Sequence, residues 1–447
     1  MFHSFWLELR RLILRFGWLP LSQGIVFLLS TGAFAILARQ LGPGPYAQFA
    51  FILLVFSITS LITDLSPQGL ALINGTSRQN LRTAMQVATI SSIVGSGLLI
   101  GASLVVQGVA REYAPTPGQV LLLLIALVAQ FAMQPSRAVL VAGRLYSRIA
   151  AVDIASTALG LGLAIALAAM GFSAGVLVGQ LAITAASKAV LCILIARSNW
   201  GSGVERTPVT LGKAIRFGIR VVPLNMGSYL SRSVDSGLMP LFVAPALSAT
   251  YARSFQLAAV PLTQLQLSLG PAILDRLAKS RHEDHKAATD SKRRLWFLLQ
   301  ASSSGFAILI SSLSGVLQWM LFGPDWLLVN VTISAMCVCL PGMAIASFGS
   351  WTAQLEGTAT RTVGHLLILL LSPLCVVATA ASFGYSAALV ALMLVGGLIQ
   401  PSLLSALHRS SLPRTLANGL LGLTIQWLVL VAIFVVVASE TDFWAGL

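Results

Sequence analysis

Long apolar segments separated by short polar turns repeat along the whole chain. Crossing about 30 Å of hydrocarbon takes about 20 helical residues, and the apolar segments reach this length. The turns between them hold the glycine, proline and charged residues that end such helices. This pattern predicts spans at residues 18–39, 47–72, 84–109, 119–141, 149–170, 175–196, 214–243, 248–275, 295–321, 327–354, 362–382, 385–407 and 417–438.

The composition agrees with this pattern. Of the 447 residues, 56% are hydrophobic and 9% are charged, with a mean hydropathy of +0.86. Soluble domains carry about 25% charged residues, so the composition excludes a soluble protein. We therefore expect an all-α polytopic membrane protein with about 13 transmembrane helices.

The basic residues give an orientation. With a cytoplasmic N-terminus, 22 of the 28 Lys and Arg residues fall on the cytoplasmic side, and only Arg39 and Arg111 fall on the opposite side. This is the asymmetry of the positive-inside rule. The net charge of +14 therefore reflects topology and does not indicate a nucleic-acid partner. The same alternation places the C-terminus outside the cytoplasm.

The spans divide into two sets of six with one span left over. The polar linker 197–213 separates the sets, and both sets enter the membrane from the same side, as in a parallel repeat. Two six-helix bundles around a central cavity are therefore expected. The segments are a cytoplasmic amphipathic N-terminus 1–17, a bundle 18–196, the cytoplasmic linker 197–213, a bundle 214–407, and an appended helix and tail 408–447.

Span seven carries polar residues on one helix face. Asn225, Ser228, Tyr229, Arg232 and Asp235 recur at helical spacing. A charged group in hydrocarbon costs about 2.5–3.5 kcal/mol, and it usually faces a cavity or a partner. Two interpretations stay open: Arg232 and Asp235 pair only to lower the insertion cost, or the face lines a water-filled cavity. The neighbouring amide and hydroxyl groups favour the cavity.

Other interior spans also carry polar groups. Arg253 and Gln256 lie on span eight, and Lys188 lies midway along span six. Asp64 lies in span two, where Pro67 is expected to kink the helix. Asp153 lies near the expected start of a span, beside Arg148. The helix dipole stabilises a carboxylate at such a position, so we interpret Asp153 as structural.

No motif indicates catalysis. The chain has no H-E-x-x-H, G-x-S-x-G, P-loop or paired C-x-x-C pattern. Cys192, Cys337, Cys339 and Cys375 all fall in apolar segments, which favours small core side chains over metal ligands. We therefore expect no enzyme, no catalytic residue, no cofactor and no metal site.

Several stretches resemble the polysaccharide-biosynthesis (Wzx-like) flippases of the multidrug/oligosaccharidyl-lipid/polysaccharide exporter superfamily. Besides Asp235, they are "ARQLGPGPYAQFAF" (38–51), "TDLSPQGL" (63–70), "ATYARSFQLA" (249–258), "LFGPDW" (321–326) and "LEGTATR" (355–361). They occur in the expected order over most of the chain. The chain departs from the family at Ser66 and Ala47, where such flippases usually have glycine, and in its thirteenth span.

The resemblance implies a flippase in the bacterial cytoplasmic membrane. Such proteins alternate between inward-open and outward-open forms and accept a polyprenyl-diphosphate-linked oligosaccharide in a cationic central cavity, for surface polysaccharide synthesis. On this basis the substrate cavity is formed by Arg232, Asp235, Arg253, Lys188, Asn225 and Gln256. The basic residues would hold the diphosphate, the amides would hold sugar hydroxyls, and Asp64 or Asp235 would bind a coupling ion.

The implied partners are the lipid-linked glycan, membrane lipids, and a polysaccharide polymerase with glycosyltransferases. Two alternatives remain. A cation-coupled drug or small-molecule antiporter of the same superfamily would have a more aromatic and acidic pocket. A membrane glycan polymerase or ligase would have a large extracytoplasmic loop with catalytic groups, whereas the loops expected on that side are short.

The orientation can be tested by cysteine labelling of intact cells. A cysteine at position 173, in a loop expected outside, should react with a membrane-impermeant maleimide. A cysteine at position 280, in the charged segment 276–294, should react only after the membrane is permeabilised. The native protein supplies the background for its own four cysteines. Labelling of Ser280→Cys in intact cells would reverse the predicted topology.

Overall fold

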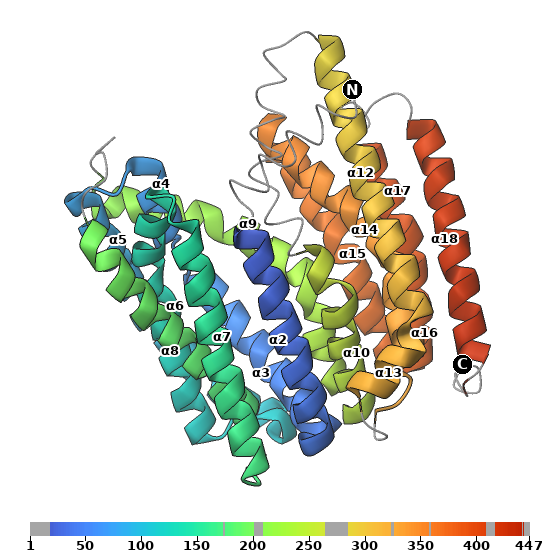
Figure 1. The fold of residues 1–447 in the computed structure, drawn as a ribbon, viewed down its shortest axis with the longest axis horizontal. Coiled ribbons are helices and arrows are strands. Elements are labelled where there is room, and N and C mark those ends of the chain that lie inside the picture. Colours follow the sequence, from blue (N-terminus) through green and yellow to red (C-terminus); the bar gives the residue numbers. More distant parts are fainter. Residues whose placement is uncertain are drawn as a thin grey trace. The chain divides into compact units, whose positions relative to one another are not determined.

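The computed structural model consists of helices joined by short connections (Figure 1). It describes residues 18–172, 175–200, 209–263, 285–322, 326–356, 359–407, 416–439 and 441. The expected surface helix at 1–17, residues 201–208 of the linker 197–213, and the C-terminal tail apart from Thr441 lie outside these described residues. The all-α expectation is confirmed, because every long element of the described chain is a helix.

The chain forms two compact units, Met1–Met226 and Gly227–Leu447. In the first unit α6 packs on α8, and α7 packs on both α2 and α8. Its helices are α2 (Trp18–Leu41), α3 (Pro43–Thr63), α4 (Pro67–Asn74), α5 (Arg78–Val109), η1 (Arg111–Tyr113), α6 (Pro117–Ala142), α7 (Tyr146–Ala169), α8 (Val176–Ala196), η2 (Arg197–Asn199) and the first part of α9 (Leu211–Leu238).

The second unit is arranged around α14. This helix packs against α10, α12, α13, α15, α17 and α18, and 83% of its apolar segment is buried. The elements are η3 (Met239–Leu241), α10 (Pro245–Ala258), α12 (His285–Ser312), α13 (Ser314–Leu321), α14 (Val329–Glu356), α15 (Ala359–Phe383), α16 (Tyr385–Ala391), the π-helix η4 (Leu392–Ile399), α17 (Gln400–Leu407) and α18 (Leu416–Ser439).

Within the described residues, helices occupy the positions of the expected spans, while residues 264–275 of the expected span 248–275 lie outside the described part of the chain. Among the described residues, nine helical stretches are long and apolar enough to cross a membrane, and the bent pair α12–α13 would make a tenth. The helix α9 is outside this set because its charged and amide residues lower its hydropathy. The helix α12 already begins at His285, so the second part of the charged segment 276–294 is helical and not a loop.

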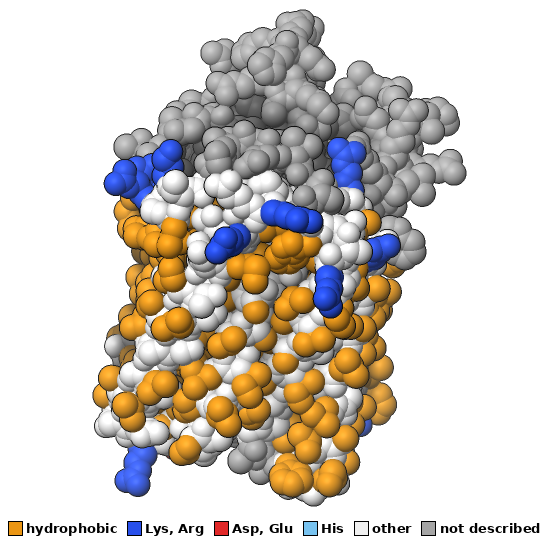
Figure 2. Space-filling model, turned by 90° about the vertical axis from the view of Figure 1, so that its left-hand side faces the viewer, with side chains coloured by type: hydrophobic (Ala, Val, Ile, Leu, Met, Phe, Trp, Pro, Cys, Tyr) orange, Lys and Arg blue, Asp and Glu red, His pale blue; other side chains and the backbone are white. Residues whose placement is uncertain are grey.

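The surface of the helices is typical of lipid contact. Large apolar side chains are exposed along α5, among them Ile93, Leu104 and Val105. On the face drawn in Figure 2, apolar side chains cover most of the helices, and Lys and Arg side chains gather mainly towards one end. Exposed apolar surface of this extent is unfavourable in water and stable in hydrocarbon.

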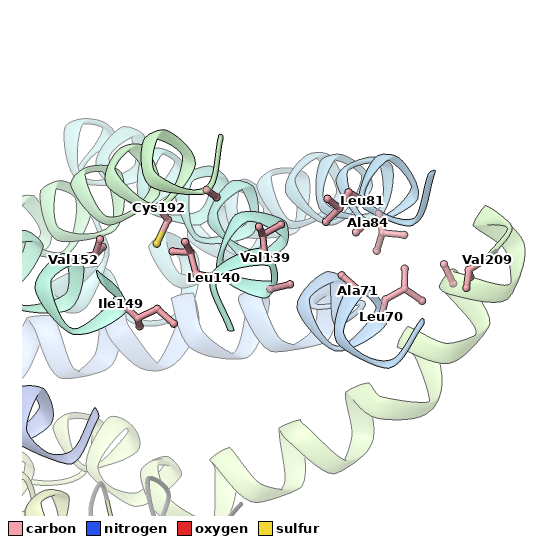
Figure 3. Packing of buried hydrophobic residues seen from close by; sticks show 14 residues of the cluster. Leu70, Ala71, Leu81, Ala84, Val139, Leu140, Ile149, Val152, Cys192 and Val209 are labelled. Atoms are coloured by element: carbon pink, nitrogen blue, oxygen red, sulfur yellow. The ribbon is translucent and has the colours of Figure 1, made fainter. Parts of the chain in front are cut away.

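The buried interior of the first unit includes a cluster at the ends of several helices (Figure 3). Leu70 of α4, Leu81 of α5, Leu140 of α6 and Cys192 of α8 contribute to it. The prediction that the cysteines are core side chains is confirmed for Cys192, Cys337 and Cys339, which are buried thiols, while Cys375 is half-buried.

The start of α9 belongs to this first unit. The backbone N–H of Val209 donates to Oδ1 of Asn80 at 3.1 Å, and Oγ1 of Thr83 donates to the carbonyl of Val209 at 3.1 Å. Gly218 lies so close to Leu65 that a Cβ would approach its backbone within 2.6 Å. The two units therefore divide inside α9, after the polar linker 197–213.

The thirteenth helix, α18, is an integral part of the second unit. It packs against α12 and α14. Gln300 of α12 donates to Gln426 at 2.8 Å, and the indole of Trp427 donates to the carbonyl of Met393 at 3.1 Å. That carbonyl belongs to the π-helix, whose backbone hydrogen bonds join residues five apart, and the indole is an additional donor to it. The indole of α18 therefore binds a polar group inside the unit.

The second span is broken, as Pro67 predicted. The helix α3 ends at Thr63, and α4 begins at Pro67. Between them Ser66 adopts the left-handed conformation, with φ 56° and ψ 53°. This conformation costs an L-residue about 1–2 kcal/mol, which explains why the related flippases usually have glycine here.

The strain at Ser66 gives a testable prediction. Ser66→Gly should unfold at the same temperature as the native protein or a higher one. Ser66→Val should reduce the free energy of unfolding by about 1–2 kcal/mol or more, because a β-branched residue fits this conformation poorly. Thermal unfolding of the purified chain measures both. Ser92→Val, within the regular helix α5, is the matched control, and equal stability of the two Ser66 variants would contradict the argument.

Candidate functional site

The break in the second span fixes the position of Asp64. Asp64 directly follows α3, and its Oδ1 accepts a hydrogen bond from the backbone N–H of Ser66 at 2.9 Å. Asp residues commonly bind their own backbone two positions on and so form a local turn. The carboxylate is therefore held by the turn that interrupts the span.

Amide side chains from α6 face this turn. Gln134 donates from Nε2 to Oδ1 of Asp64 at 3.2 Å, and its Oε1 accepts from the backbone N–H of Gln68 at 3.4 Å. One turn earlier, Gln130 donates to Oγ of Ser60 at 3.0 Å. These contacts connect α6 to both parts of the broken span.

A cavity of about 370 Å³ lies between these elements. All of its lining residues belong to the first unit. They are Asp64, Ser66, Gln68, Gly69, Leu72, Gln130, Met133, Gln134 and Arg137. Its wall therefore combines a carboxylate, a guanidinium and amides with a few apolar groups.

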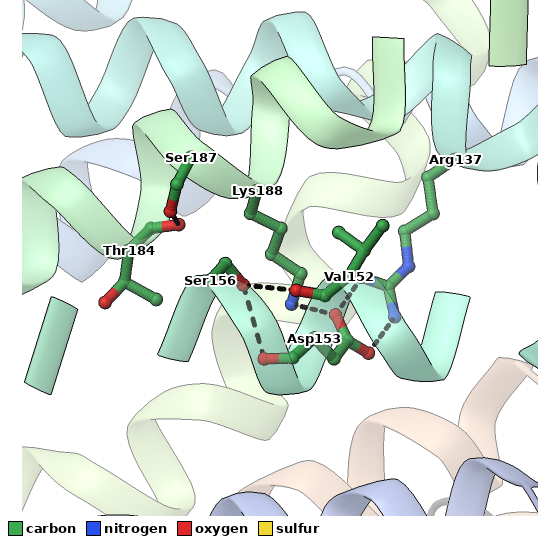
Figure 4. A network of polar contacts seen from close by, with 7 residues as sticks. All are labelled: Arg137, Val152, Asp153, Ser156, Thr184, Ser187 and Lys188. Carbon is green, nitrogen blue, oxygen red and sulfur yellow. Dashed lines mark hydrogen bonds and ion pairs between the residues drawn. The ribbon is translucent and has the colours of Figure 1, made fainter. Parts of the chain in front are cut away.

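Arg137 also belongs to an ion-pair network (Figure 4). Its guanidinium forms two parallel contacts with the carboxylate of Asp153 on α7, at 3.3 and 3.4 Å. Nζ of Lys188 on α8 lies 2.5 Å from Oδ1 of the same carboxylate. The Asp153 side chain is only 3% exposed, whereas Arg137 and Lys188 are 22% and 27% exposed. The network thus has two partly accessible cations for one buried anion, a formal charge of +1.

The helix-dipole interpretation of Asp153 is wrong, because α7 begins at Tyr146 and Asp153 lies beyond its first turn. Ion pairs hold the carboxylate instead. The sequence placed Asp153 beside Arg148, whereas the structure pairs it with Arg137 and Lys188. The predicted cavity residue Lys188 therefore shares its carboxylate with a second cation. Arg137 lies near the C-terminal end of α6.

In the second unit, Asp235 forms a buried pair with a phenol. The hydroxyl of Tyr251 on α10 donates to Oδ2 of Asp235 at 2.6 Å, and the N–H of Ser236 is 2.8 Å from Oδ1. Asp235 is 7% exposed, and Tyr251 is fully buried. The ring of Tyr251 packs edge-on against Tyr385, whose hydroxyl lies 2.7 Å from Oγ1 of Thr332. The hydrogen bond of Asp235 and the hydroxyl contact on α14 are therefore separate, and the packed rings of the two tyrosines lie between them.

The remaining predicted residues lie on α9 and α10. Arg253 hydrogen-bonds Gln256 one turn later on α10, so these two predicted residues are brought together. Asn225 is half-buried on α9. The backbone of Arg232 is helical, and its side chain lies outside the described residues. Asp235 and Arg253 both belong to the second unit, whereas Lys188 and Asp64 belong to the first.

Part of the polar wall was missed in the sequence, although a signal was present. Gln130, Gln134 and Arg137 recur at i, i+4 and i+7 and therefore share one face of α6. This periodicity equals that of span seven. Tyr251 was not predicted as a site residue, since an isolated aromatic residue in a sequence does not reveal its partner.

The network yields a stability prediction. Asp153→Ala should reduce the free energy of unfolding by about 3–5 kcal/mol, because it leaves two cations without their buried partner. Lys188→Met should cost less, because Arg137 still neutralises the carboxylate. The double variant should be more stable than the sum of the single losses predicts, by about 0.5–3 kcal/mol. Denaturant unfolding of the four proteins measures this coupling, and strictly additive losses would contradict the network.

Comparison with known proteins identifies the fold. The structure resembles the lipid II flippase MurJ in its inward closed conformation, with a TM-score of 0.61 and 13% identity, covering 93% of this chain and 96% of that one. It resembles the eukaryotic MATE transporter AtDTX14 with a TM-score of 0.62 and 18% identity, and the match covers 90% of this chain and 95% of that one. For the MATE transporter VcmN of Vibrio cholerae the TM-score is 0.57 and the identity is 13%, and the match covers 90% of this chain and 97% of that one.

These neighbours are transporters of the kind that the sequence resembles, and at such low identity they establish the fold alone. No curated protein sequence matches this chain. Residues 36–326, more than half of the chain, match the family Polysacc_synt_3, described as polysaccharide biosynthesis protein. The chain is therefore a multi-pass membrane protein that belongs to this polysaccharide biosynthesis family.

Proposed function

We propose that this protein is a flippase that moves a polyprenyl-diphosphate-linked oligosaccharide across the bacterial cytoplasmic membrane by alternating access. The observation that carries the proposal is the match to a polysaccharide biosynthesis family by a chain with the fold of a lipid II flippase. Surface polysaccharide synthesis needs such a step, because a glycan assembled on a lipid at one membrane face has to reach the other.

The interior charges support an anionic substrate. Arg and Lys contact phosphate oxygens through charge-assisted hydrogen bonds, Arg in bidentate form. Arg232, Arg253 and Lys188 are the proposed contacts of the diphosphate. The network around Lys188 carries a formal charge of +1 with both cations partly accessible, which is consistent with attraction of an anion.

Other polar groups have separate proposed roles. The amides of Asn225 and Gln256 are suited to sugar hydroxyls, since an amide both donates and accepts hydrogen bonds. Asp64 and Asp235 are the proposed sites of a coupling proton or cation. Asp235 is the more enclosed of the two, and its hydrogen bond with Tyr251 would be rearranged when an ion binds.

The alternative function is a cation-coupled antiporter of drugs or small molecules. The MATE transporters among the structural neighbours favour it. The excess of cations over anions in the Asp153 network favours an anionic lipid-linked substrate instead. The two functions differ in what accumulates in cells that lack the protein. Loss of a flippase would leave lipid-linked oligosaccharide in the membrane, and loss of an antiporter would leave an added cationic dye inside the cell.

Arg232→Ala and Asp235→Ala test the proposal. Each variant should abolish or strongly reduce surface polysaccharide and cause lipid-linked oligosaccharide to accumulate in the membrane. Removing one charge-assisted contact costs about 1.5–3 kcal/mol, which corresponds to roughly a 10- to 100-fold loss in affinity. Immunoblots of the membrane fraction should show normal insertion.

Arg216→Ala is the matched control, because Arg216 is an exposed residue on the same helix. It should leave surface polysaccharide unchanged. Normal polysaccharide in both Arg232→Ala and Asp235→Ala cells would refute the assigned cavity. Sensitivity of the deletion strain to cationic dyes, with its polysaccharide intact, would favour the antiporter.

A further inference from the structure

We propose that the cavity of the first unit binds an uncharged sugar residue of the transported glycan, at a subsite distinct from the diphosphate contacts. This proposal rests on the proposed function and adds the chemical group that the cavity recognises. Its residues are Asp64, Gln130, Gln134 and Arg137, with Leu72 and Met133 as the apolar part of the wall.

Hydrogen-bonding capacity remains at this wall after the internal contacts are counted. Asp64 accepts both of its contacts on Oδ1, and Gln130 uses its amide nitrogen on Ser60. Within the described part of the chain, Oδ2 of Asp64 and Oε1 of Gln130 have no hydrogen-bond partner. A hydroxyl group can donate to either oxygen and accept from an amide or a guanidinium.

The charges of the wall favour a neutral ligand. A phosphate would be repelled by the carboxylate of Asp64. A metal cation would be repelled by the guanidinium of Arg137 and would find only one carboxylate, so the coupling ion proposed at Asp64 would be a proton. A sugar hydroxyl avoids both penalties, because it donates to the acid and accepts from the base.

The size and the apolar groups fit the same ligand. A cavity of about 370 Å³ is near the lower end of the roughly 300–1,000 Å³ typical of small-molecule sites. It therefore suits a sugar residue better than a whole oligosaccharide. Leu72 and Met133 offer apolar contact to the C–H face of the ring, and the flexible thioether of Met133 adapts to its shape.

The position of the cavity also agrees with this role. The helix α4 leads to Arg78 and α6 leads to Arg144, and both arginines are exposed. The distribution of basic residues assigns these helix ends to the cytoplasmic side. Under the proposed function, the glycan is assembled on that side, so the cavity would meet the sugar before translocation.

The test compares two ligands on the full-length protein in lipid nanodiscs. One is the lipid-linked oligosaccharide extracted from cells that lack the protein, and the other is polyprenyl diphosphate without sugar. The native protein should bind the glycan-bearing lipid more tightly. Gln130→Leu should bind it roughly 5- to 30-fold more weakly and bind polyprenyl diphosphate as the native protein does.

Two further variants complete the test. Met133→Trp fills the cavity without removing a polar group and should cause the same selective loss, so the test also works if Gln130→Leu fails to insert. Gln180→Leu is the matched control, since Gln180 is a half-buried amide of α8 in the same unit and does not line the cavity. It should bind both ligands normally.

The outcomes separate the two proposals. A native preference for the glycan-bearing lipid that persists in Gln130→Leu and Met133→Trp would overturn the subsite and leave the flippase function in place. Equal native affinity for both ligands would also overturn it. Binding of the glycan-bearing lipid is also measured at several sodium concentrations and pH values. If Gln130→Leu and Met133→Trp lose a dependence of this binding on sodium or pH but keep the preference for the glycan, the cavity is an ion site and the subsite is overturned. Absence of native binding to either lipid would refute the flippase function itself.

Discussion

A carboxylate inside a membrane helix bundle has to be hydrogen-bonded or paired, because hydrocarbon supplies no water to solvate it. The chain meets this constraint in three different ways. Asp153 is paired with the cations of Arg137 and Lys188, Asp64 is held by its own backbone turn and an amide, and Asp235 accepts from a buried phenol. In each case the partner comes from another element or requires a break in the helix, so these groups also determine local architecture.

The architectural consequences differ between the two units. In the first unit, the network of Asp153 joins α6, α7 and α8, and the turn at Asp64 interrupts the second span and opens a polar cavity. In the second unit, Asp235 joins α9 to α10, and the hydroxyl of Tyr385 contacts Thr332 on the central helix α14. The thirteenth helix contributes Trp427, which donates to a carbonyl of the π-helix. Hydrogen bonds and ion pairs between buried polar groups thus specify which helices pack together, whereas apolar contacts alone would not distinguish one helix from another.

The helices were largely predictable from the sequence, because span length follows from the thickness of hydrocarbon and the breaks follow from Pro and Gly. The start of α12 was not, since backbone hydrogen bonds let a helix continue beyond its apolar segment. The polar residues on α9 were visible as a periodic face. The partner of Lys188 was not visible, because Asp153 lies on a different helix and only packing brings the two together. The face of Gln130, Gln134 and Arg137 was periodic, but its significance depends on the turn at Asp64 across from it.

Stability alone does not account for the network around Asp153. Apolar residues of similar volume often replace a buried ion pair with no loss of stability, and here a second cation is added to a carboxylate that one cation would neutralise. Asp64 lines the same cavity as Arg137 and is a second carboxylate near this network, so the four charged groups together are formally neutral. Nearby, the wall of the cavity balances Asp64 against Arg137 and offers amides. Under the proposed function, the charged diphosphate of a lipid-linked glycan would meet the cations of this network, and its hydroxyl-rich sugars would meet the polar wall of the cavity.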